Sequence, residues 1–312
     1  MSISGGISNA IINALEMDCN AFQIFSRNPR GWATKPLPNL EVENFKTRLK
    51  SSKIRRDSIC VHMPYLPNLS SPNDSLHDKS IKVLIEEIKR CSELGIPYLV
   101  LHFGSNLGAG KDTGINQFVK ACRIALEKYG SSSPSSENSI STSKSREFRK
   151  KQDSAKKEDS SQEFSSGVTI LVENNVGHRN TIGNRFEDIR LILDRLSSFQ
   201  KSIGVCFDSC HAFAAGYDLK SIGSVESTLE QFDDIIGLKN LKLVHFNDSR
   251  DELGSNLDRH ENLGLGKIGI EGLEALCTHK SISSVPLIME TPIEKHSEDM
   301  GTLRSLLNKL QE

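Results

Sequence analysis

Residues 243–266 read LVHFNDSRDELGSNLDRHENLGLG, and this stretch decides how the rest of the chain is interpreted. It opens with the end of a short apolar run that is typical of a buried strand, and a polar loop follows. His245 stands at the strand end, and Asp258 and His260 follow in the tripeptide Asp-Arg-His. Imidazole and carboxylate are ligands of zinc, and alternate side chains of an extended backbone point the same way, so one ion could bind both. The alternative is a solvated loop that happens to carry a histidine.

Seven short runs rich in β-branched, aliphatic and aromatic residues recur along the chain, and helix-length stretches such as 80–94 and 186–196 lie between them. The runs are residues 21–25, 59–63, 98–103, 169–173, 203–208, 241–246 and 286–290. Near-continuous apolar strands that alternate with helices predict a parallel sheet covered on both faces. The fold class is therefore α/β, and an eighth strand would close a (β/α)8 TIM barrel.

Metal-binding residue types stand at the ends of six of these runs. They are His62, His102, Glu173, Asp208, His245 and Glu290. In parallel barrels the active site is built from the C-terminal ends of the strands and the loops after them. One such histidine is more often structural, but six strand ends argue for a common site. With His211, Asp258 and His260, five histidines and four carboxylates converge on one face. Their burial without partners would be costly, and bound metal ions would remove that cost.

The other four histidines are expected on the surface, in helix starts or polar loops. They are His77, His178, His279 and His296. Of these, His178 follows the fourth run closely enough to lie near the site.

Composition favours one large intracellular domain over residues 1–312. The 312 residues carry a net charge of −1, and no apolar run approaches the length of a membrane span. The seven cysteines are scattered and odd in number, which indicates reduced thiols. The charge excludes a strongly basic protein but not a nucleic-acid-binding one, because a local patch or bound cations could supply a positive field. We expect a monomer, although the sequence leaves the oligomeric state open.

Residues 131–166 differ in kind from the rest of the chain. Fourteen of these 36 residues are serine, the charges are mixed, and apolar residues are nearly absent. Such a Ser/Lys-rich segment cannot bury enough surface to fold, so we interpret it as a disordered insertion within one domain. A regulatory or nucleic-acid-contacting role is the alternative to a tolerated loop.

Several motifs together resemble the endonuclease IV family of apurinic/apyrimidinic (AP) endonucleases, over nearly the whole chain outside the insertion. They are SISGGISNAI at 2–11, FSRNPRGW at 25–32, HMPYLPN at 62–68, LHFGS at 101–105, LVEN at 171–174, GVCFDSCHAFAAGYD at 204–218, HFNDS at 245–249, DRH at 258–260 and METP at 289–292. The resemblance implies a TIM barrel with three zinc ions.

The ligand sets that the resemblance implies leave no position substituted. One ion falls to His62, His102 and Glu173, a second to Glu173, Asp208, His245 and Glu290, and the third to His211, Asp258 and His260. Zinc suits sites rich in histidine, and manganese could take one position. Glu173, which would bridge two ions, and Glu290, which would orient the attacking water, are the expected catalytic residues.

The family's reaction is hydrolysis on the 5′ side of an abasic site in double-stranded DNA during base excision repair. It leaves a 3′-hydroxyl and a 5′-deoxyribose phosphate, and trimming of blocked 3′ ends is a related activity. Arg30, Tyr65 and Leu66 match the residues that enter the DNA beside the lesion. The alternative is that they are ordinary loop residues. The substrate would place the protein in the cytoplasm or nucleoid, or in a nucleus.

One departure from the family concerns the first strand, which normally precedes the SISGG segment. Met1 falls where that strand should be ending, so we expect the strand to be largely missing and the edges of its two neighbours to be exposed.

Two rival functions remain. A metal-dependent sugar isomerase or epimerase on a related barrel would also place His, Asp and Glu at strand ends, but for one or two ions. The set of His211, Asp258 and His260 is the extra feature that favours a phosphodiesterase with three ions. A non-catalytic binder of DNA lesions is the third reading, and the completeness of the ligand set argues against it.

Overall fold

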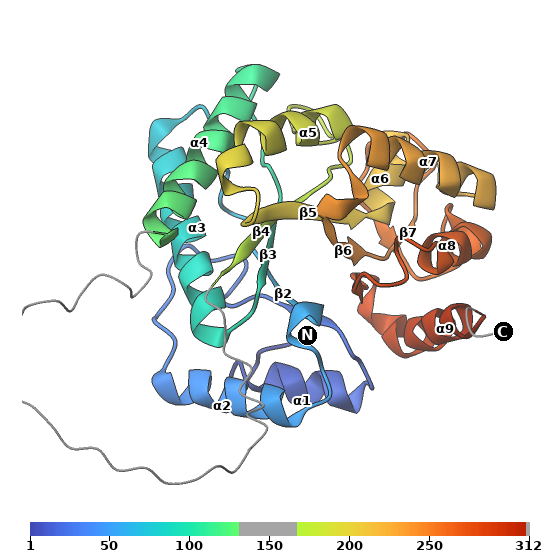
Figure 1. The fold of residues 1–312 in the computed structure, drawn as a ribbon, viewed down its shortest axis with the longest axis horizontal. Coiled ribbons are helices and arrows are strands. Elements are labelled where there is room, and N and C mark those ends of the chain that lie inside the picture. The colour runs from blue at the N-terminus through green and yellow to red at the C-terminus, as the bar shows by residue number, and fades with distance from the viewer. Residues whose placement is uncertain (131–166, 310–312) are drawn as a thin grey trace, which may run out of the picture.

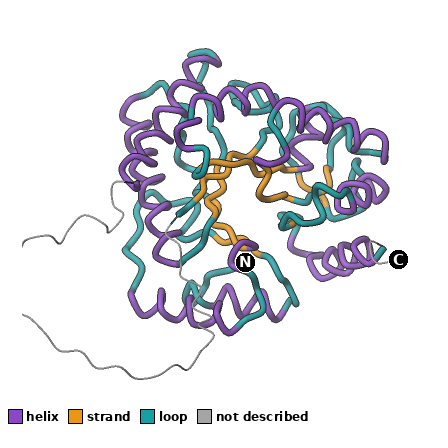
Figure 2. Tube along the Cα trace, viewed as in Figure 1, coloured by secondary structure: helices purple, strands orange, loops and turns teal. Residues whose placement is uncertain are grey.

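The computed structural model describes residues 1–130 and 167–309 of the chain. Seven parallel strands form one sheet in the order β1-β2-β3-β4-β5-β6-β9. Figure 2 shows this sheet curving inside a ring of helices. The strands are β1 (Phe22–Ile24), β2 (Ile59–His62), β3 (Tyr98–Leu101), β4 (Thr169–Glu173), β5 (Ile203–Asp208), β6 (Leu241–His245) and β9 (Leu287–Ile288). Each lies within one of the seven predicted runs, so the predicted parallel α/β barrel is confirmed.

Helices alternate with the strands and cover the outside of the sheet (Figure 1). They are α1 (Asn9–Glu16), α2 (Asn39–Ser51), α3 (Asp74–Leu94), α4 (Lys111–Gly130), α5 (Phe186–Arg195), α6 (Ser209–Ala215), α7 (Ile222–Ile235), α8 (Gly269–Thr278) and α9 (His296–Asn308). Within the described ranges no helix combines the length and the apolar character that a membrane span requires. All seven cysteines are free thiols. The insertion at 131–166 lies outside the described residues.

Side chains along each strand point alternately into two cores, because successive residues of a β-strand face opposite sides of the sheet. In β4, Ile170 and Val172 face the helices and the main core, whereas Leu171 faces the interior of the barrel. The interior holds one small set of side chains, which we call the inner layer. Its members are Cys60, Val100, Leu171, Cys206, Leu243 and Ile288, with Ala21 and Tyr98 packed against it. The inner layer forms the floor beneath the C-terminal ends of the strands.

The ring of strands is not closed by backbone pairing. Within the described residues β1 pairs only with β2, and β9 pairs only with β6. A cavity of about 630 Å³ lies between these two edge strands, and α1 and α9 also contribute to its walls. The amino group of Met1 donates a hydrogen bond to the carbonyl of Gln23 on the β1 edge. The expected exposure of two strand edges is thus found in the structure.

Two local features differ from the sequence expectations. The loop after β6 contains a short antiparallel hairpin, β7 (Asp248–Ser249) with β8 (His260–Glu261), which was not predicted. The prediction that His77 lies on the surface is wrong. Asn73 caps α3 by accepting from the amide of Leu76 at 2.9 Å, so the helix begins before the predicted residue 80. His77 therefore faces α4, where its Nε2 lies 2.9 Å from the carbonyl of Gln117, and its side chain is fully buried.

The three remaining histidines outside the site differ in exposure. His178 is exposed, as expected. His279 and His296 are half-buried, because His279 pairs with Glu226 at 3.6 Å and His296 lies 2.7 Å from the carbonyl of Thr291.

Candidate metal centre

The structure brings the nine expected ligand residues together at the C-terminal ends of the strands. Two groups, which we call the strand-end clusters, share Glu173. The first contains His62, His102 and Glu173, and the second contains Glu173, Asp208, His245 and Glu290. Within each group one donor atom per residue lies within 4.8 Å of all the others. This spacing suits a single ion per group, because zinc takes nitrogen and oxygen ligands at about 2.0–2.2 Å.

Strand geometry places the residues of the strand-end clusters directly above the inner layer. In four strands, and directly after β3, the residue two positions after an inner-layer member carries the site side chain: Cys60 precedes His62, Leu171 precedes Glu173, Cys206 precedes Asp208, Leu243 precedes His245, and Val100 precedes His102. Ile288 precedes Glu290 in the same way just beyond β9. Because residues two apart in a strand point to the same side, the residue two positions after an inner-layer residue also points into the barrel, one layer higher.

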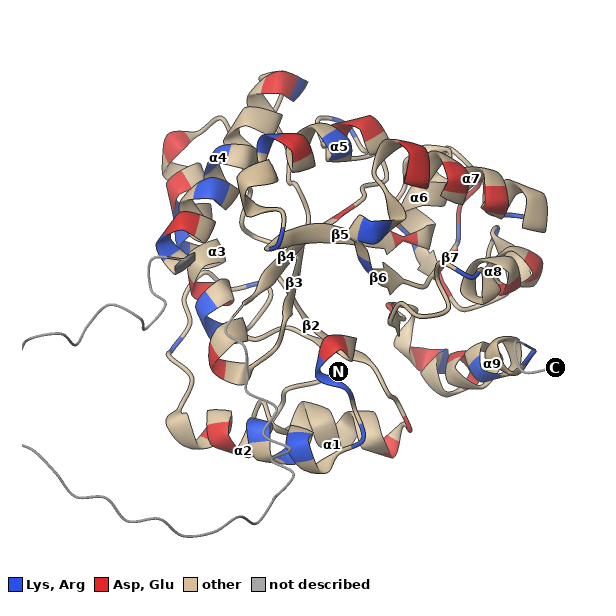
Figure 3. Ribbon diagram, in the orientation of Figure 1, with Lys and Arg blue, Asp and Glu red and all other residues tan. Residues whose placement is uncertain are grey.

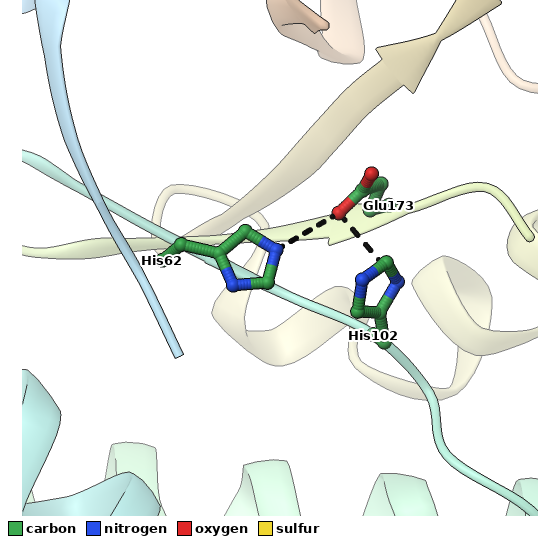
Figure 4. A group of neighbouring side chains, drawn as sticks. All are labelled: His62, His102 and Glu173. Atoms are coloured by element: carbon green, nitrogen blue, oxygen red, sulfur yellow. Dashed lines mark hydrogen bonds and ion pairs between the residues drawn. The ribbon is translucent and has the colours of Figure 1, made fainter. Parts of the chain in front are cut away.

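Glu173 lies between the two strand-end clusters, with one oxygen facing each. Its Oε2 is 3.2 Å from Nε2 of His62 and 3.6 Å from Nδ1 of His102 (Figure 4). Its Oε1 is 2.9 Å from Nδ1 of His245 and 3.3 Å from Nδ1 of His211. The side chain is fully buried. A carboxylate in this position can serve two ions at once.

The third group, which we call the loop cluster, contains His211 from α6 and both Asp258 and His260 from the loop after β6. Nε2 of His211 is 3.2 Å from Oδ1 of Asp258, and Nε2 of His260 is 3.5 Å from the same oxygen. Asp208, Cys210 and His260 form another possible group. We assign His260 to the loop cluster because the thiol of Cys210 already donates to the carbonyl of Arg259 at 3.5 Å.

Backbone carbonyls fix the ring orientation of three of these histidines. Nδ1 of His62 lies 2.8 Å from the carbonyl of Met63, and Nδ1 of His211 lies 3.0 Å from that of Asn174. Nδ1 of His260 lies 3.1 Å from the carbonyl of Glu290. A carbonyl only accepts, so in each ring Nδ1 carries the hydrogen and Nε2 presents its lone pair to the cluster. Such an outer hydrogen bond is typical of histidines that bind metal.

Several ring nitrogens at the centre are buried without a hydrogen-bond partner, which tests whether the residues fit metal ions. Among the described residues none forms a hydrogen bond with Nδ1 of His102, Nε2 of His211 or Nε2 of His260. Buried polar atoms are normally paired, so unpaired atoms that face the same small space need an explanation. Divalent ions would supply it, and the donor set of imidazole and carboxylate fits zinc.

Two asparagines support Asp208, and the sequence analysis did not single them out. Asn247 donates to Oδ2 of Asp208 at 2.8 Å and accepts from the amide of Glu290 at 2.8 Å. Asn174 accepts from the amide of Asp208 at 2.7 Å and donates to its carbonyl at 3.0 Å. The sequence does carry a signal for both. Asn174 directly follows Glu173, and Asn247 lies two residues after His245.

Electrostatics keep the bridging carboxylate ionised. Burial alone would raise the pKa of Glu173, but the surrounding imidazoles, His102 first among them, outweigh burial and hold the pKa well below its usual value. Burial raises the pKa of the neighbouring Cys206 thiol to about 12. The centre therefore offers a carboxylate and neutral thiols, not thiolates.

The three residues expected to enter DNA lie together beside the first strand-end cluster. Arg30, Tyr65 and Leu66 are all at least partly exposed, and Tyr65 is 59% accessible. The amide of Tyr65 donates to the carbonyl of Pro29 at 3.1 Å, so the two loops that carry these residues are joined. The Tyr65 ring lies 6.0 Å from that of His62, centroid to centroid.

Comparisons with known proteins find relatives along nearly the whole chain. Residues 11–310 match the family described as xylose isomerase-like TIM barrel. The chain is 42% identical over 305 residues to a probable endonuclease 4 of Cenarchaeum symbiosum, and the match covers 98% of this chain and 96% of that protein.

Solved structures place the same fold beside two different chemistries. Endonuclease IV from Thermus thermophilus is 29% identical, with a TM-score of 0.78, and the match covers 99% of this chain and 97% of that one. A D-tagatose 3-epimerase-like protein is 18% identical, with a TM-score of 0.66, and the match covers 98% and 95%. The second likeness shows the fold alone.

Proposed function

The chain belongs to the endonuclease IV family, within the xylose isomerase-like TIM barrels, and from this premise we propose that its three clusters bind three metal ions for phosphodiester hydrolysis. It is an AP endonuclease of DNA repair. The proposed substrate is duplex DNA with an abasic site, cut on its 5′ side to leave a 3′-hydroxyl and a 5′-deoxyribose phosphate. We propose zinc for all three clusters, with manganese as the alternative at one of them.

The ions, when bound, supply an activated water and positive charge that offsets the developing charge of the reacting phosphate. The protein's own residues hold that chemistry in place. Glu173 joins the two strand-end clusters through its two oxygens. The Glu290 side chain is 23% exposed, so one face of this carboxylate can reach an incoming water and orient it. We therefore retain Glu173 and Glu290 as the catalytic carboxylates.

Recognition of the lesion is proposed to depend on the exposed loops beside the first cluster. An abasic nucleotide has lost its base stacking, so turning its sugar out of the helix costs less than at an intact pair. Tyr65 and Leu66 are large apolar side chains held in solvent, and Arg30 extends from the adjoining loop. Apolar wedges of this kind stabilise a bent, unstacked duplex. Little dependence on base sequence is expected.

The charge distribution agrees with a site whose positive field comes mainly from bound ions. Lys and Arg are interspersed with Asp and Glu around the ring of helices (Figure 3). The chain as a whole carries a net charge of −1. Bound metal ions would therefore supply much of the attraction for the phosphates. Action as a monomer inside the cell completes the proposal.

The loop cluster is the observation that favours a phosphodiesterase over a sugar isomerase or epimerase. A sugar isomerase or epimerase of the same fold would need the strand-end clusters but not a further group above them. His211, Asp258 and His260 form that further group and lie next to Asp208, with Nε2 of His260 3.6 Å from its Oδ2. Three neighbouring ions suit a phosphodiester, which presents several oxygens in the transition state.

The test is incision of a duplex oligonucleotide that carries one tetrahydrofuran analogue of an abasic site. The analogue cannot undergo β-elimination, so only hydrolysis cuts it. Wild type should nick on the 5′ side, and Glu290→Gln should lose at least about 10²-fold in kcat, in the range of a positioned acid–base group. Glu294→Gln makes the same change at an exposed residue close by and should cut normally. A folded wild type that contains three metal ions but does not cut would favour the isomerase or epimerase.

A further inference from the structure

The six residues of the strand-end clusters form a layer above the inner layer, and a residue on β1 is its seventh member. Ala21 packs against the inner layer, and Gln23 follows it by two residues, as each strand-end ligand follows an inner-layer residue. Phe22 and Ile24 on either side face the main core. Gln23 is the polar exception in this strand and is only 8% exposed. Its position is therefore equivalent to that of the ligands, although its amide is a poor zinc ligand.

The amide of Gln23 forms hydrogen bonds with two of the ligand residues. Its Nε2 lies 2.6 Å from Oε1 of Glu290. Its Oε1 lies 3.0 Å from Nε2 of His245, and the thiol of Cys60 donates to the same oxygen at 3.3 Å. The side chain thus reaches from β1 across to β6 and to the residue just after β9.

The direction of these bonds determines which nitrogen of His245 is free. An ionised Glu290 only accepts hydrogen bonds, so the NH₂ end of Gln23 must face it. The carbonyl end then faces His245, and Nε2 of that ring must carry the hydrogen. Nδ1 keeps its lone pair, and this atom lies 2.9 Å from Oε1 of Glu173 and 3.2 Å from Oε2 of Glu290. The lone pair points to the second strand-end cluster.

The arrangement at His245 contrasts with that of the other fixed rings. His62, His211 and His260 are oriented by backbone carbonyls, which no substitution removes. His245 is oriented by a side chain and uses the opposite ring nitrogen for the cluster. Its orientation is therefore open to a direct mutational test.

We propose that Gln23 is a positioning residue of the metal centre, which sets the tautomer of His245 and holds Glu290 in line with the second strand-end cluster. The proposal rests on the proposed binding of metal ions there. Gln23 does not touch the reacting atoms, so its effect is exerted through these two ligands. Outer hydrogen bonds of this kind typically change metal affinity by about 10- to 100-fold.

The variant Gln23→Met keeps the length of the side chain and removes both hydrogen bonds. We expect zinc to bind about 10- to 100-fold more weakly at one of three sites, measured by competition with a chelator and by elemental analysis. In zinc-loaded protein kcat should fall while KM for DNA stays within about twofold, because Gln23 is buried below the DNA-facing loops. Gln117→Met, at a partly buried glutamine on α4 that belongs to none of the three clusters, is the matched control.

Wild-type zinc affinity and kcat in Gln23→Met would overturn the proposal. A second measurement uses the wild-type protein and does not depend on the folding of a variant. In metal-loaded protein with ¹⁵N-labelled histidine, the ring of His245 should show a protonated Nε2 and a coordinated Nδ1. The reverse pattern would also overturn the proposal. The expected zinc defect in Gln23→Met with no DNA incision by wild type would instead contradict the proposed function alone.

Discussion

The strand-end clusters and the loop cluster offer the same types of metal-binding side chain, but different parts of the fold hold them. Every residue of the strand-end clusters stands at the end of a strand or within two residues of one, and Glu173 and His245 are fully buried. The loop cluster takes His211 from the seven-residue helix α6 and its other two members from the segment between β6 and α8. Asp258 has a side chain that is 57% exposed. The first of these parts is the sheet itself, and the second is a loop that must be held separately.

Asp248 is one of the residues that hold that loop, at its C-terminal part. Its carboxylate is fully buried and accepts from the amides of Gly264 and Gly266, each at 3.0 Å, and of Ile268 at 3.0 Å. A side chain at Gly266 would collide with this arrangement, because a Cβ there would lie 2.4 Å from the carbonyl oxygen of Ser249. The difference between the clusters therefore teaches that the strand-end positions follow from barrel geometry, whereas the loop is held by individual contacts, among them those of the buried carboxylate of Asp248.

The largest effect is expected from Glu173→Gln, which removes the residue that the strand-end clusters share. Both clusters lose a charged ligand, so the protein should retain fewer metal ions by elemental analysis. The variant should lose several kcal/mol of transition-state stabilisation, which corresponds to a fall of about 10³-fold or more in kcat/KM. Incision of the tetrahydrofuran duplex measures it. Glu187→Gln on the exposed face of α5 is the control. Full activity of Glu173→Gln would show that the two clusters do not act together.

A smaller effect is expected from Asp258→Asn, which weakens the loop cluster alone. Because Asp258 is more exposed than the other carboxylates, one ion should be lost while those of the strand-end clusters remain. We expect kcat to fall by about 10²-fold, less than for Glu173→Gln, since one ion in place of two is affected. Metal content and single-turnover incision separate the two variants. Asp234→Asn on α7 is the control, and equal metal loss in both site variants would abolish the distinction drawn here.

The smallest effect is expected from Tyr65→Ala, which leaves both kinds of cluster intact. Loss of one stacking ring costs about 1–3 kcal/mol of DNA binding, so KM should rise about tenfold or more with little change in metal content. Tyr65→Phe keeps the ring and should bind almost as wild type does. An alanine variant that incises abasic DNA as well as wild type would remove Tyr65 from the recognition surface.

The sequence predicted the strand-end residues well because their positions depend on the period of two and on the known face of a parallel barrel. His62, Glu173 and Asp208 could each be placed from a short apolar run and its end. Gln23 was missed although it occupies the same layer, because an amide is not a metal-ligand residue type. Its hydrogen bonds to His245 and Glu290 join residues 222 and 267 positions apart, and no local pattern reports such a contact.

Residues outside the strands were harder to interpret. His77 was assigned to the surface because its neighbours are polar, but the cap at Asn73 starts the helix early and turns the ring toward α4. The β7–β8 hairpin comprises only two residues on each side, too few for a recognisable alternation. Both features depend on contacts between distant segments, which override the local sequence pattern.

The unpaired edges of β1 and β9 give the sheet two ends, and this has a consequence for how the molecule opens. Across those ends the hydrogen bond from Gln23 to Glu290 takes the place of a backbone ladder. Any fluctuation that parts the two strands must therefore break the hydrogen bond between Gln23 and Glu290. By linkage, ions that bind only the assembled centre stabilise these strands against opening. Amide hydrogen exchange at β1 and β9 would thus report metal occupancy, and that at the central pair β4 and β5 would not.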